Sequence, residues 1–333
     1  MKVLVTGSTG YVGIPLCRRL AEKGQQVHAL ARSVQGAGHA GIRVFKGDLL
    51  DPGSVAAAVE GCDAVYHLAA YAGVWAKDPG QFRLTNVEGT RTLLAAAQAA
   101  GVRKVVITST GGVMGHSPGN GILVDEATHP DPVLASAYEQ SKLEAERLAF
   151  SYPGNGMEVV VVNPTRIFGP GALNESNSVT KLIHQFYEGK WRIIPGDGES
   201  IGNYVYLDDV VTGHILAMEK GKPGERYILG GDNVTYNEFF ALLRKLTGSR
   251  QKLFRAPIGP MLFYARLEML KTRLTGKKPL IVPAFVHKLT KNWSMSSQKA
   301  QTELGYSPIP LADGLELTLE WIKKNKNQDT AFL

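Results

Sequence analysis

The chain has 333 residues, of which 44% are hydrophobic and 20% are charged, so it has enough apolar material for a large folded core. This composition excludes a disordered or fibrous protein. The sequence contains no run of about 18 apolar residues, which a membrane-spanning helix would need. The formal net charge of +7 is unevenly spread, because residues 1–165 carry 14 basic and 14 acidic side chains and the whole excess lies beyond them.

The first predicted elements are a strand at residues 3–5, a tight glycine turn and a helix that starts at Ile14. The turn has the spacing G-x-x-G-x-x-G, which lets backbone N–H groups and a helix N-terminus approach a pyrophosphate. The spacing alone is a weak signal, because an ordinary strand-to-helix turn also carries glycines. A strand and glycine turn so near the start leave no room for a signal peptide, so we expect a cytoplasmic protein. The residues that we expect to hold a dinucleotide here are Gly7, Thr9, Gly10, Tyr11, Val12 and Gly13.

Short apolar runs alternate with helical stretches in the first half of the chain. Runs at 27–31, 42–45, 64–68, 105–108 and 159–162 predict strands, and 93–100 and 142–150 predict helices. This alternation is typical of an α/β fold with a doubly wound parallel sheet of the Rossmann type. We expect residues 1–165 to form this domain and 203–220 to return to it. Residues 166–202 and 221–333 are expected to form a smaller, mostly helical substrate lobe.

Several local signals refine this outline. Cys17 and Cys62 have neither metal-ligand nor disulfide spacing, so we expect two buried thiols and no metal site. Thr235 and Glu238 have the spacing of a capping box that opens a helix. A strand is expected at 226–229 and a terminal helix at about 313–324.

The end of the second predicted strand bears on the choice of cofactor. In dinucleotide folds a carboxylate at this place binds the free ribose 2′-OH of NAD, whereas an arginine accommodates the 2′-phosphate of NADP. Arg32 lies there, and residues 25–47 contain no Asp or Glu. We therefore expect NADP(H), with NAD(H) as the alternative. Asp48, after the third strand, is placed either to reach the adenine amine or to cap a local turn.

Tyr138 and Lys142 are four residues apart in a strongly helical segment, so both side chains lie on one helix face. A nearby ammonium favours the phenolate and would lower the tyrosine pKa toward the range of acid–base catalysis. A lone Y-x-x-x-K occurs often by chance. Its position strengthens it, because it follows Thr108-Ser109-Thr110 at the carboxyl end of the fifth strand, where ligands bind in such sheets.

With these motifs in order, the chain resembles the extended short-chain dehydrogenase/reductase family over nearly its whole length. The motifs are Thr6-Gly7-x-x-Gly10-x-x-Gly13, Gly47-Asp48-Leu49, His67-Leu68-Ala69-Ala70, Asn86-Val87-x-Gly89-Thr90, Tyr138-x-x-x-Lys142, Asn163-Pro164-Thr165-Arg166-x-x-Gly169-Pro170 and Tyr204-Val205-Tyr206-Leu207-Asp208-Asp209-Val210.

The resemblance implies roles for individual residues. Tyr138 would be the general acid/base, and Lys142 would bind the nicotinamide ribose and lower the tyrosine pKa. A hydroxyl residue would hold the substrate oxygen, and the alignment puts Thr110 there, or Ser109 if the register shifts by one. Asn86 would lie near the active site, with an ordinary helix position as the alternative. Further cofactor contacts are expected from Leu49, Leu68, Ala69, Ala70 and Pro164.

Two large branches of this family differ in chemistry. Nucleotide-sugar epimerases and dehydratases often carry an arginine that clamps the diphosphate, in the pattern G-D-G-x-x-x-R-D-F. This chain has Gly202 and Asn203 at the arginine and aspartate positions. Because hydrogen bonds to charged groups contribute roughly 1.5 to 3 kcal/mol each, the loss favours a carbonyl reductase resembling dihydroflavonol reductase or 3β-hydroxysteroid dehydrogenase. An epimerase or dehydratase with bound NAD(P) and a non-catalytic NADP(H)-binding sensor are the alternatives.

The substrate and partners are less constrained by sequence. Tyr71, Val74, Trp75 and Arg166 are the candidates for the substrate pocket, and the first three suit an aromatic or aliphatic ketone. Between Arg244 and Lys299 there are 13 Lys or Arg residues and one acid, Glu268. Such a segment would suit an acidic carrier such as coenzyme A or the surface of a membrane near a lipid substrate, or it is simply a solvated basic face. No nucleic-acid motif accompanies the charge. A homodimer is expected from the family.

Overall fold

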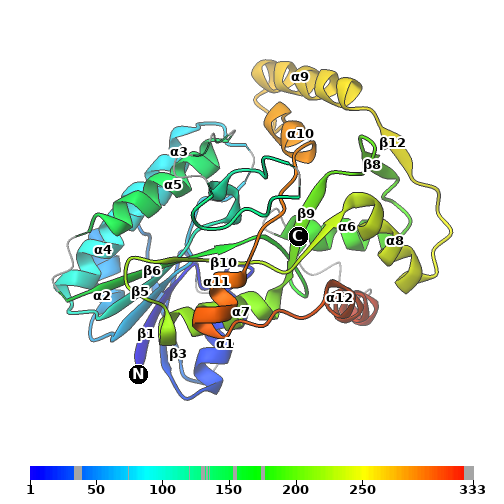
Figure 1. The fold of residues 1–333 in the computed structure, drawn as a ribbon. Helices are drawn as coiled ribbons and strands as arrows, with labels where there is room; N and C mark the ends of the chain where they lie inside the picture. The colour runs from blue at the N-terminus through cyan, green and yellow to red at the C-terminus, as the bar shows by residue number, and fades with distance from the viewer. Residues whose placement is uncertain are drawn as a thin grey trace.

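The computed structural model describes residues 1–33, 40–73, 75–119, 121–128, 132, 134, 136–152, 156–173 and 177–325. Its centre is a seven-stranded sheet in the order β10-β6-β5-β4-β1-β2-β3, and all its pairings are parallel (Figure 1). The predicted doubly wound sheet is confirmed. The strands are β1 Lys2–Thr6, β2 Gln26–Ala31, β3 Ile42–Lys46, β4 Ala64–His67, β5 Lys104–Thr108, β6 Glu158–Pro164 and β10 Arg226–Leu229.

Helices cover both faces of this sheet, which is why its central strands are continuous apolar runs. One face carries α1 (Gly13–Glu22), α7 (Leu207–Lys220) and α11 (Gln298–Leu304), whose apolar side chains share one core with the strands. The other carries α2 (Pro52–Val59), α4 (Gly89–Ala99) and α5 (Ala137–Phe150) around a second core. Cys17 and Cys62 are buried as free thiols, one in each core, as expected.

The seventh strand differs from the predicted domain boundaries. β10 and α11 come from the range 221–333, which sequence reasoning assigned to the substrate lobe, yet both pack on the large sheet. The physical reason is the return of the chain along α7, which brings the fully buried run Tyr227-Ile228-Leu229 beside β6. The expected return of 203–220 and the expected strand at 226–229 therefore lead into a further sheet strand.

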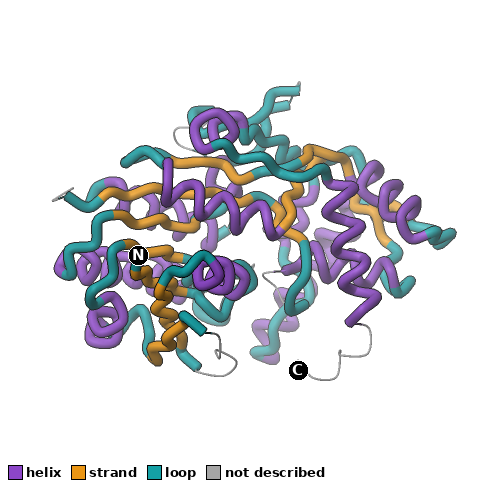
Figure 2. Tube along the Cα trace, turned by 90° about the horizontal axis from the view of Figure 1, so that it is seen from below, coloured by secondary structure: helices purple, strands orange, loops and turns teal. Residues whose placement is uncertain are grey.

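The second lobe combines helices with two small sheets (Figure 2). The small sheets were not predicted, because their strands are only three to six residues long. The three-stranded sheet joins β7 (Arg166–Phe168), β9 (Ile201–Tyr206) and β11 (Asp232–Thr235), and β8 (Ile193–Pro195) pairs with β12 (Phe254–Ala256). The helices are α6 Ser178–Tyr187, α8 Tyr236–Thr247, α9 Ile258–Thr275, α10 Pro283–Leu289 and α12 Leu311–Asn325.

Local signals hold in detail. The capping box of Thr235 and Glu238 opens α8 with both reciprocal hydrogen bonds. Between β4 and α4, α3 (Gly80–Arg83) continues into a π-helical turn (Leu84–Glu88), and a 3₁₀ turn (Gly111–Met114) follows β5. Among the helices of the described ranges, none combines the length and apolar character needed to cross a bilayer.

Candidate active site

The glycine turn after β1 is built so tightly that side chains are excluded from it. Gly7 has a φ of +68°, and a Cβ on it would lie 2.6 Å from the backbone nitrogen of Ala69. A Cβ on Gly13 would lie 2.1 Å from the carbonyl oxygen of Gly7, so the first helix packs directly on the turn. Gly10 donates its N–H to that same carbonyl at 2.9 Å, while Thr9 and Gly10 stay exposed. This cradle fits a pyrophosphate at the N-terminus of α1.

Tyr11 joins this turn to the second lobe. Its side chain is buried, and its hydroxyl donates to the carbonyl oxygen of Gly169 at 3.0 Å. Burial raises the pKa of the Tyr11 phenol well above its ordinary range. The Tyr11 side chain therefore fixes the turn against the lobe, and Val12 beside it is half-buried.

A buried histidine holds the neighbouring strand end in place. His67 lies within hydrogen-bond distance of the hydroxyls of Thr6, at 2.7 Å, and Thr90, at 2.9 Å. Burial lowers the pKa of His67 to about 3, so the ring is neutral at pH 7. Thr6 also accepts from the N–H of Ala69. The network sets the half-buried segment from Leu68 to Ala70 beside Gly7.

At the far end of the turn lie the residues expected to meet the adenosine. Arg32 is exposed directly after β2. Asp48 accepts from the N–H of Leu50 at 2.9 Å, which is the local-turn alternative. The side chain of Leu49 is buried against Gly89 at the start of α4.

The helix α5 carries the expected acid–base pair. Ser136 caps its N-terminus by accepting from the N–H of Glu139, and Tyr138 lies in the first turn. One turn later, the Lys142 side chain runs under the sheet edge, only 2% of the residue is exposed, and its Nζ donates to the Thr108 carbonyl at 2.7 Å. Burial of the ammonium lowers the pKa of Lys142 to about 8.

The expected lowering of the tyrosine pKa is not seen in the cofactor-free chain. The pKa of Tyr138 is instead raised to about 12, first because burial disfavours the phenolate and second because the Glu139 carboxylate adds a negative charge beside it. Lys142 has its own charge withdrawn from water and spends one donor on Thr108, so it does not offset these effects. The Tyr138 phenol therefore keeps its proton at neutral pH.

The two hydroxyl candidates after β5 have different surroundings. Thr110 is half-buried, and its Oγ1 accepts from the N–H of Gly112 at 3.2 Å, which leaves its own O–H free to donate. Ser109 is buried, and its hydroxyl lies beside the carboxyl of Glu146 under the sheet. This placement supports Thr110 as the residue that would hold a substrate oxygen.

Asn86 is buried in the π-helical turn and joins three parts of the site. Its Oδ1 accepts from the N–H of Tyr71 at 2.7 Å, and its Nδ2 donates to the Ser141 hydroxyl at 2.9 Å. Ser141 in turn donates to the backbone carbonyl of Tyr138. Asn86 therefore links the segment at Tyr71 to the first turns of α5.

A cavity of about 330 Å³ opens beside Tyr138. Sequence reasoning missed most of its walls, because they come from α10 and the segment after it, far along the chain. Lys288 also pairs with Glu139 at 2.6 Å and lies over the Trp293 ring, so α10 is tied to α5 next to Tyr138. Besides Tyr138 and Glu139, the lining residues are Gly73, His116, Leu134, Ser136, Ala284, Phe285, His287, Lys288, Lys291 and Trp293.

The residues predicted to contact the substrate lie in different surroundings. The Tyr71 ring meets Phe82 edge-on at 5.1 Å, and Phe82 meets Tyr138 at 6.3 Å, so the three rings form one aromatic cluster. Phe82 carried no recognisable sequence signal. Trp75 is half-buried, and Val74 lies outside the described residues. Pro164 is buried at the end of β6 and neighbours Gly111 through its carbonyl.

Arg166 fills the space that the missing clamp arginine leaves. Its guanidinium donates to the hydroxyls of Tyr204 and Tyr236, each at 3.1 Å, and lies over both rings. A Cβ on Gly202 would lie 2.4 Å from its Nη1. A cation is therefore present beside position 202 after all, supplied by a different strand.

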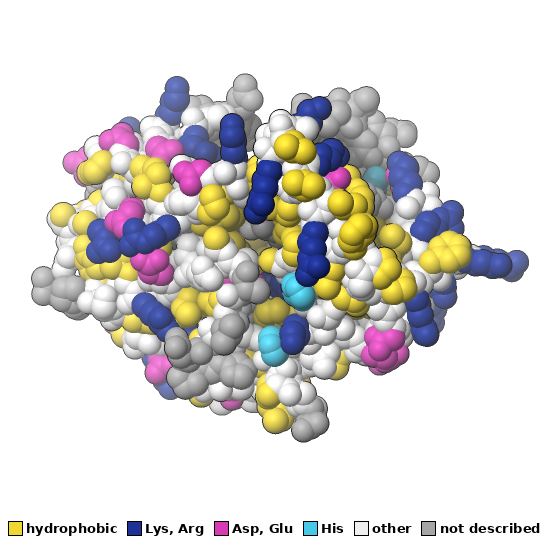
Figure 3. Space-filling view, turned by 90° about the horizontal axis from the view of Figure 1, so that it is seen from above, with side chains coloured by type: hydrophobic (Ala, Val, Ile, Leu, Met, Phe, Trp, Pro, Cys, Tyr) yellow, Lys and Arg dark blue, Asp and Glu magenta, His cyan; other side chains and the backbone are white. Residues whose placement is uncertain are grey.

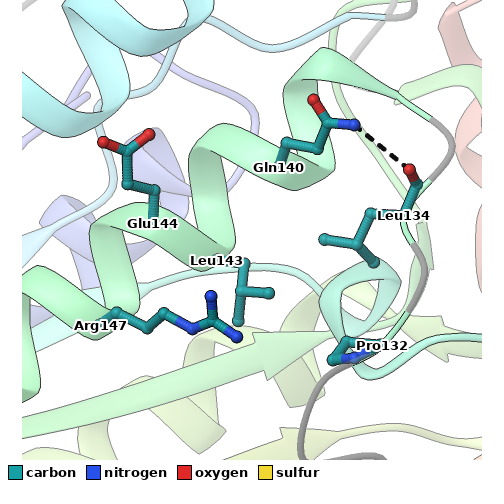
Figure 4. A pocket seen from close by; sticks show the side chains of 6 residues that line it. All are labelled: Pro132, Leu134, Gln140, Leu143, Glu144 and Arg147. Carbon is teal, nitrogen blue, oxygen red and sulfur yellow. Dashed lines mark hydrogen bonds between the residues drawn. The ribbon is translucent and has the colours of Figure 1, made fainter.

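A second hollow, of about 440 Å³, lies on the outer side of α5 (Figure 4). Leu134 closes one end by accepting from the Gln140 side chain at 3.3 Å. Glu144 on its rim pairs with Arg83. Tyr138 and Lys142 do not line it, and Leu134 is the lining residue that it shares with the cavity beside Tyr138. Its lining residues are Pro132, Leu134, Gln140, Leu143, Glu144 and Arg147.

Comparisons with known proteins agree with this geometry. A family model described as the NAD dependent epimerase/dehydratase family matches residues 3–230. A Synechocystis sp. protein, provisionally named as a dihydroflavonol 4-reductase, is 32% identical over 96% of this chain and 94% of its own length. A 2-alkyl-3-oxoalkanoate reductase of Stenotrophomonas maltophilia is 31% identical over 95% and 97%. The structure of a UDP-glucose 4-epimerase from Thermotoga maritima, with UDP-glucose, aligns with a TM-score of 0.79 at 26% identity, covering 98% and 100%.

Proposed function

The chain belongs to the NAD dependent epimerase/dehydratase family, and we propose that within it the protein is an NADP(H)-dependent reductase of a ketone in a hydrophobic or carrier-linked small molecule. The observation that carries the proposal is the cavity beside Tyr138. Its walls include Leu134, Ala284, Phe285 and Trp293, and basic side chains lie among them. Such walls suit an apolar ketone with an acidic group better than a sugar.

The chain's own residues divide the work of carbonyl reduction. When bound, NADPH supplies the hydride that adds to the carbonyl carbon. Tyr138 transfers its phenolic proton to the carbonyl oxygen, and its raised pKa keeps that proton in place at neutral pH. Thr110 donates a hydrogen bond to the same oxygen. Lys142 has ammonium donors beyond the one given to Thr108, and these would hold the nicotinamide ribose.

The glycine cradle and Arg32 support the choice of NADP(H). We expect Arg32→Ala to raise the KM for NADPH by about 10- to 100-fold, because a charge-assisted hydrogen bond to the 2′-phosphate is lost. The KM for NADH should change little. Steady-state kinetics with each cofactor measures both values. Arg43→Ala is the matched control, since Arg43 is an exposed cation on the neighbouring strand β3. Equal KM values for the two cofactors in the unmutated protein would contradict the role of Arg32.

A nucleotide-sugar epimerase is the second candidate, favoured by one observation. Arg166 supplies a cation beside Gly202, so a diphosphate would not lack a positive partner. The similarity to a UDP-glucose 4-epimerase is in line with this alternative. We favour the reductase because the two curated relatives named above carry reductase names and apolar side chains form much of the cavity wall.

One experiment separates these functions. The protein is incubated with NADPH and a panel of ketones, β-keto acids, β-ketoacyl thioesters and UDP-sugars, while NADPH absorbance and sugar products are followed. Consumption of NADPH with a ketone is the expected result. Interconversion of a UDP-sugar without net consumption would select the epimerase, and tight NADPH binding without any turnover would select the sensor.

A further inference from the structure

Helix α9 has a covered inner face and an exposed outer face that carries large apolar side chains. Its inner face buries Ala265, Glu268 and Thr272 and packs against α10. The apolar face of a surface helix normally packs against the core. The outer face therefore lacks the contact that its composition calls for. In Figure 1, α9 lies along the upper edge of the molecule, with α10 between it and the large sheet.

Four side chains make up this outer face, which we call the α9 stripe. Phe263 is 63% exposed, Leu267 46%, Leu270 53% and Leu274 80%. Their spacing of four, three and four residues places them on one side of the helix. Just beyond the helix, Leu280 is a further large apolar side chain that is 79% exposed. Single exposed leucines are ordinary on protein surfaces, but a contiguous apolar patch such as this one marks an interaction site.

The charged side chains that flank the stripe are all basic. Arg266 and Arg273 flank it on one side and Lys271 on the other, and all three are exposed. Lys277 and Lys278 are exposed at the tip. The single acid of the segment, Glu268, is turned inward, where it pairs with Lys271 at 3.2 Å and accepts from the N–H of Leu280. Figure 3 shows the molecule from above; hydrophobic and basic side chains gather toward its centre and right, and most of the acidic ones in view lie on the left.

We propose that the α9 stripe binds the surface of an anionic lipid bilayer. A projecting apolar ridge with basic side chains on both flanks buries the ridge among acyl chains and sets the cations at the anionic headgroups. A second copy of this chain fits less well, because two such faces would bring like charges together. An acidic carrier protein matches the charge, yet a convex ridge offers no groove to receive it.

The position of α9 also suggests a route for substrate entry. This route rests on the proposed function, whereas the binding of the stripe to a bilayer does not. α10 packs under α9 and supplies Ala284, Phe285 and Lys288 to the cavity beside Tyr138. A bilayer seated on the α9 stripe would therefore lie next to one wall of that cavity. A lipophilic ketone would pass from the acyl chains into the site without crossing water.

The test is co-sedimentation of the full chain with vesicles of phosphatidylcholine alone and of equal parts phosphatidylcholine and phosphatidylglycerol. We expect sedimentation with the anionic vesicles, weakening as salt is raised. The double variant Phe263→Ser/Leu274→Ser should bind about tenfold more weakly or worse, because two large apolar side chains no longer enter the bilayer. Both positions are exposed, so the fold should persist, and circular dichroism melting checks this.

Two controls separate the outcomes. Leu317→Ser changes a leucine on α12 whose exposure, 45%, matches that of Leu267 in the stripe, and it should bind like the unmutated chain. Tyr138→Phe should also bind vesicles normally, since vesicle binding needs no turnover. A failure of the proposed reductase activity can therefore be distinguished from a failure of membrane binding. The proposal is overturned if neither vesicle binds the chain or if the double variant binds as well as the original. It is also overturned if light scattering shows that the unmutated chain is a dimer and that the double variant is a monomer, because the stripe would then be a dimer interface. Binding of purified acyl carrier protein to the stripe, without binding of vesicles, would overturn it as well.

Discussion

Replacing Tyr138 with phenylalanine should lower kcat for ketone reduction by about 10²- to 10⁴-fold, the usual contribution of a positioned proton donor. The variant deletes one hydroxyl and keeps the ring, whose edge-on contact with Phe82 at 6.3 Å does not involve that hydroxyl. NADPH affinity should therefore change little. The rate of NADPH consumption gives kcat, and a fluorescence titration with NADPH gives the affinity.

Tyr71→Phe is the matched control for this variant. Tyr71 belongs to the same aromatic cluster, is partly exposed and loses the same chemical group. It should keep kcat near that of the unmutated protein. If Tyr71→Phe lost as much activity as Tyr138→Phe, or if Tyr138→Phe reduced ketones at an undiminished rate, the proton transfer would have to be assigned to another group.

The parallel sheet was predictable because its information is local. Strands such as β1 and β6 are buried on both faces and appear as unbroken apolar runs between turn residues. The strand β10 was also recognisable as an apolar run, but its place in the large sheet depends on the path of α7 over the sheet. The path of the chain in space leaves no periodic pattern in the sequence. The sequence therefore could not show that the segment after residue 221 returns to the large sheet.

The candidate site also has parts that local sequence patterns predict and parts that they do not. The glycine turn and the pair of Tyr138 and Lys142 are encoded by short spacings within a turn or one helix. The contact between Lys288 and Glu139 joins residues 149 positions apart, so no local pattern announces it. The motif predicts that an arginine is missing at Gly202, whereas the guanidinium of Arg166, which lies beside Gly202, belongs to another strand. The pKa of Tyr138 was misjudged because spacing gives the neighbouring charge but not the burial.

Lys142→Met is expected to separate activity from stability. The variant should lose about 10- to 100-fold in kcat/KM for NADPH, because charge-assisted hydrogen bonds to the ribose are lost. The free energy of unfolding at pH 7 should stay close to that of the unmutated chain. Keeping this buried ammonium charged costs about 3 kcal/mol, since its pKa falls from 10.5 to about 8, and the hydrogen bond lost at Thr108 offsets this with about 1 to 3 kcal/mol.

The pH dependence gives the sharper test, measured by urea unfolding of the cofactor-free chain at several pH values. Between about pH 8 and 10.5 the unfolded chain holds a proton on Lys142 that the folded chain has released, so the unfolding free energy should rise with pH there. Below about pH 8 the penalty is complete. Lys142→Met should lack this rise, whereas Lys104→Met should keep both it and the activity, since Lys104 also donates to a backbone carbonyl but lies at the other end of β5. Parallel stability curves for Lys142→Met and the unmutated chain would show that the ammonium is not held in the folded protein as described, and its role toward the ribose would lose its structural basis.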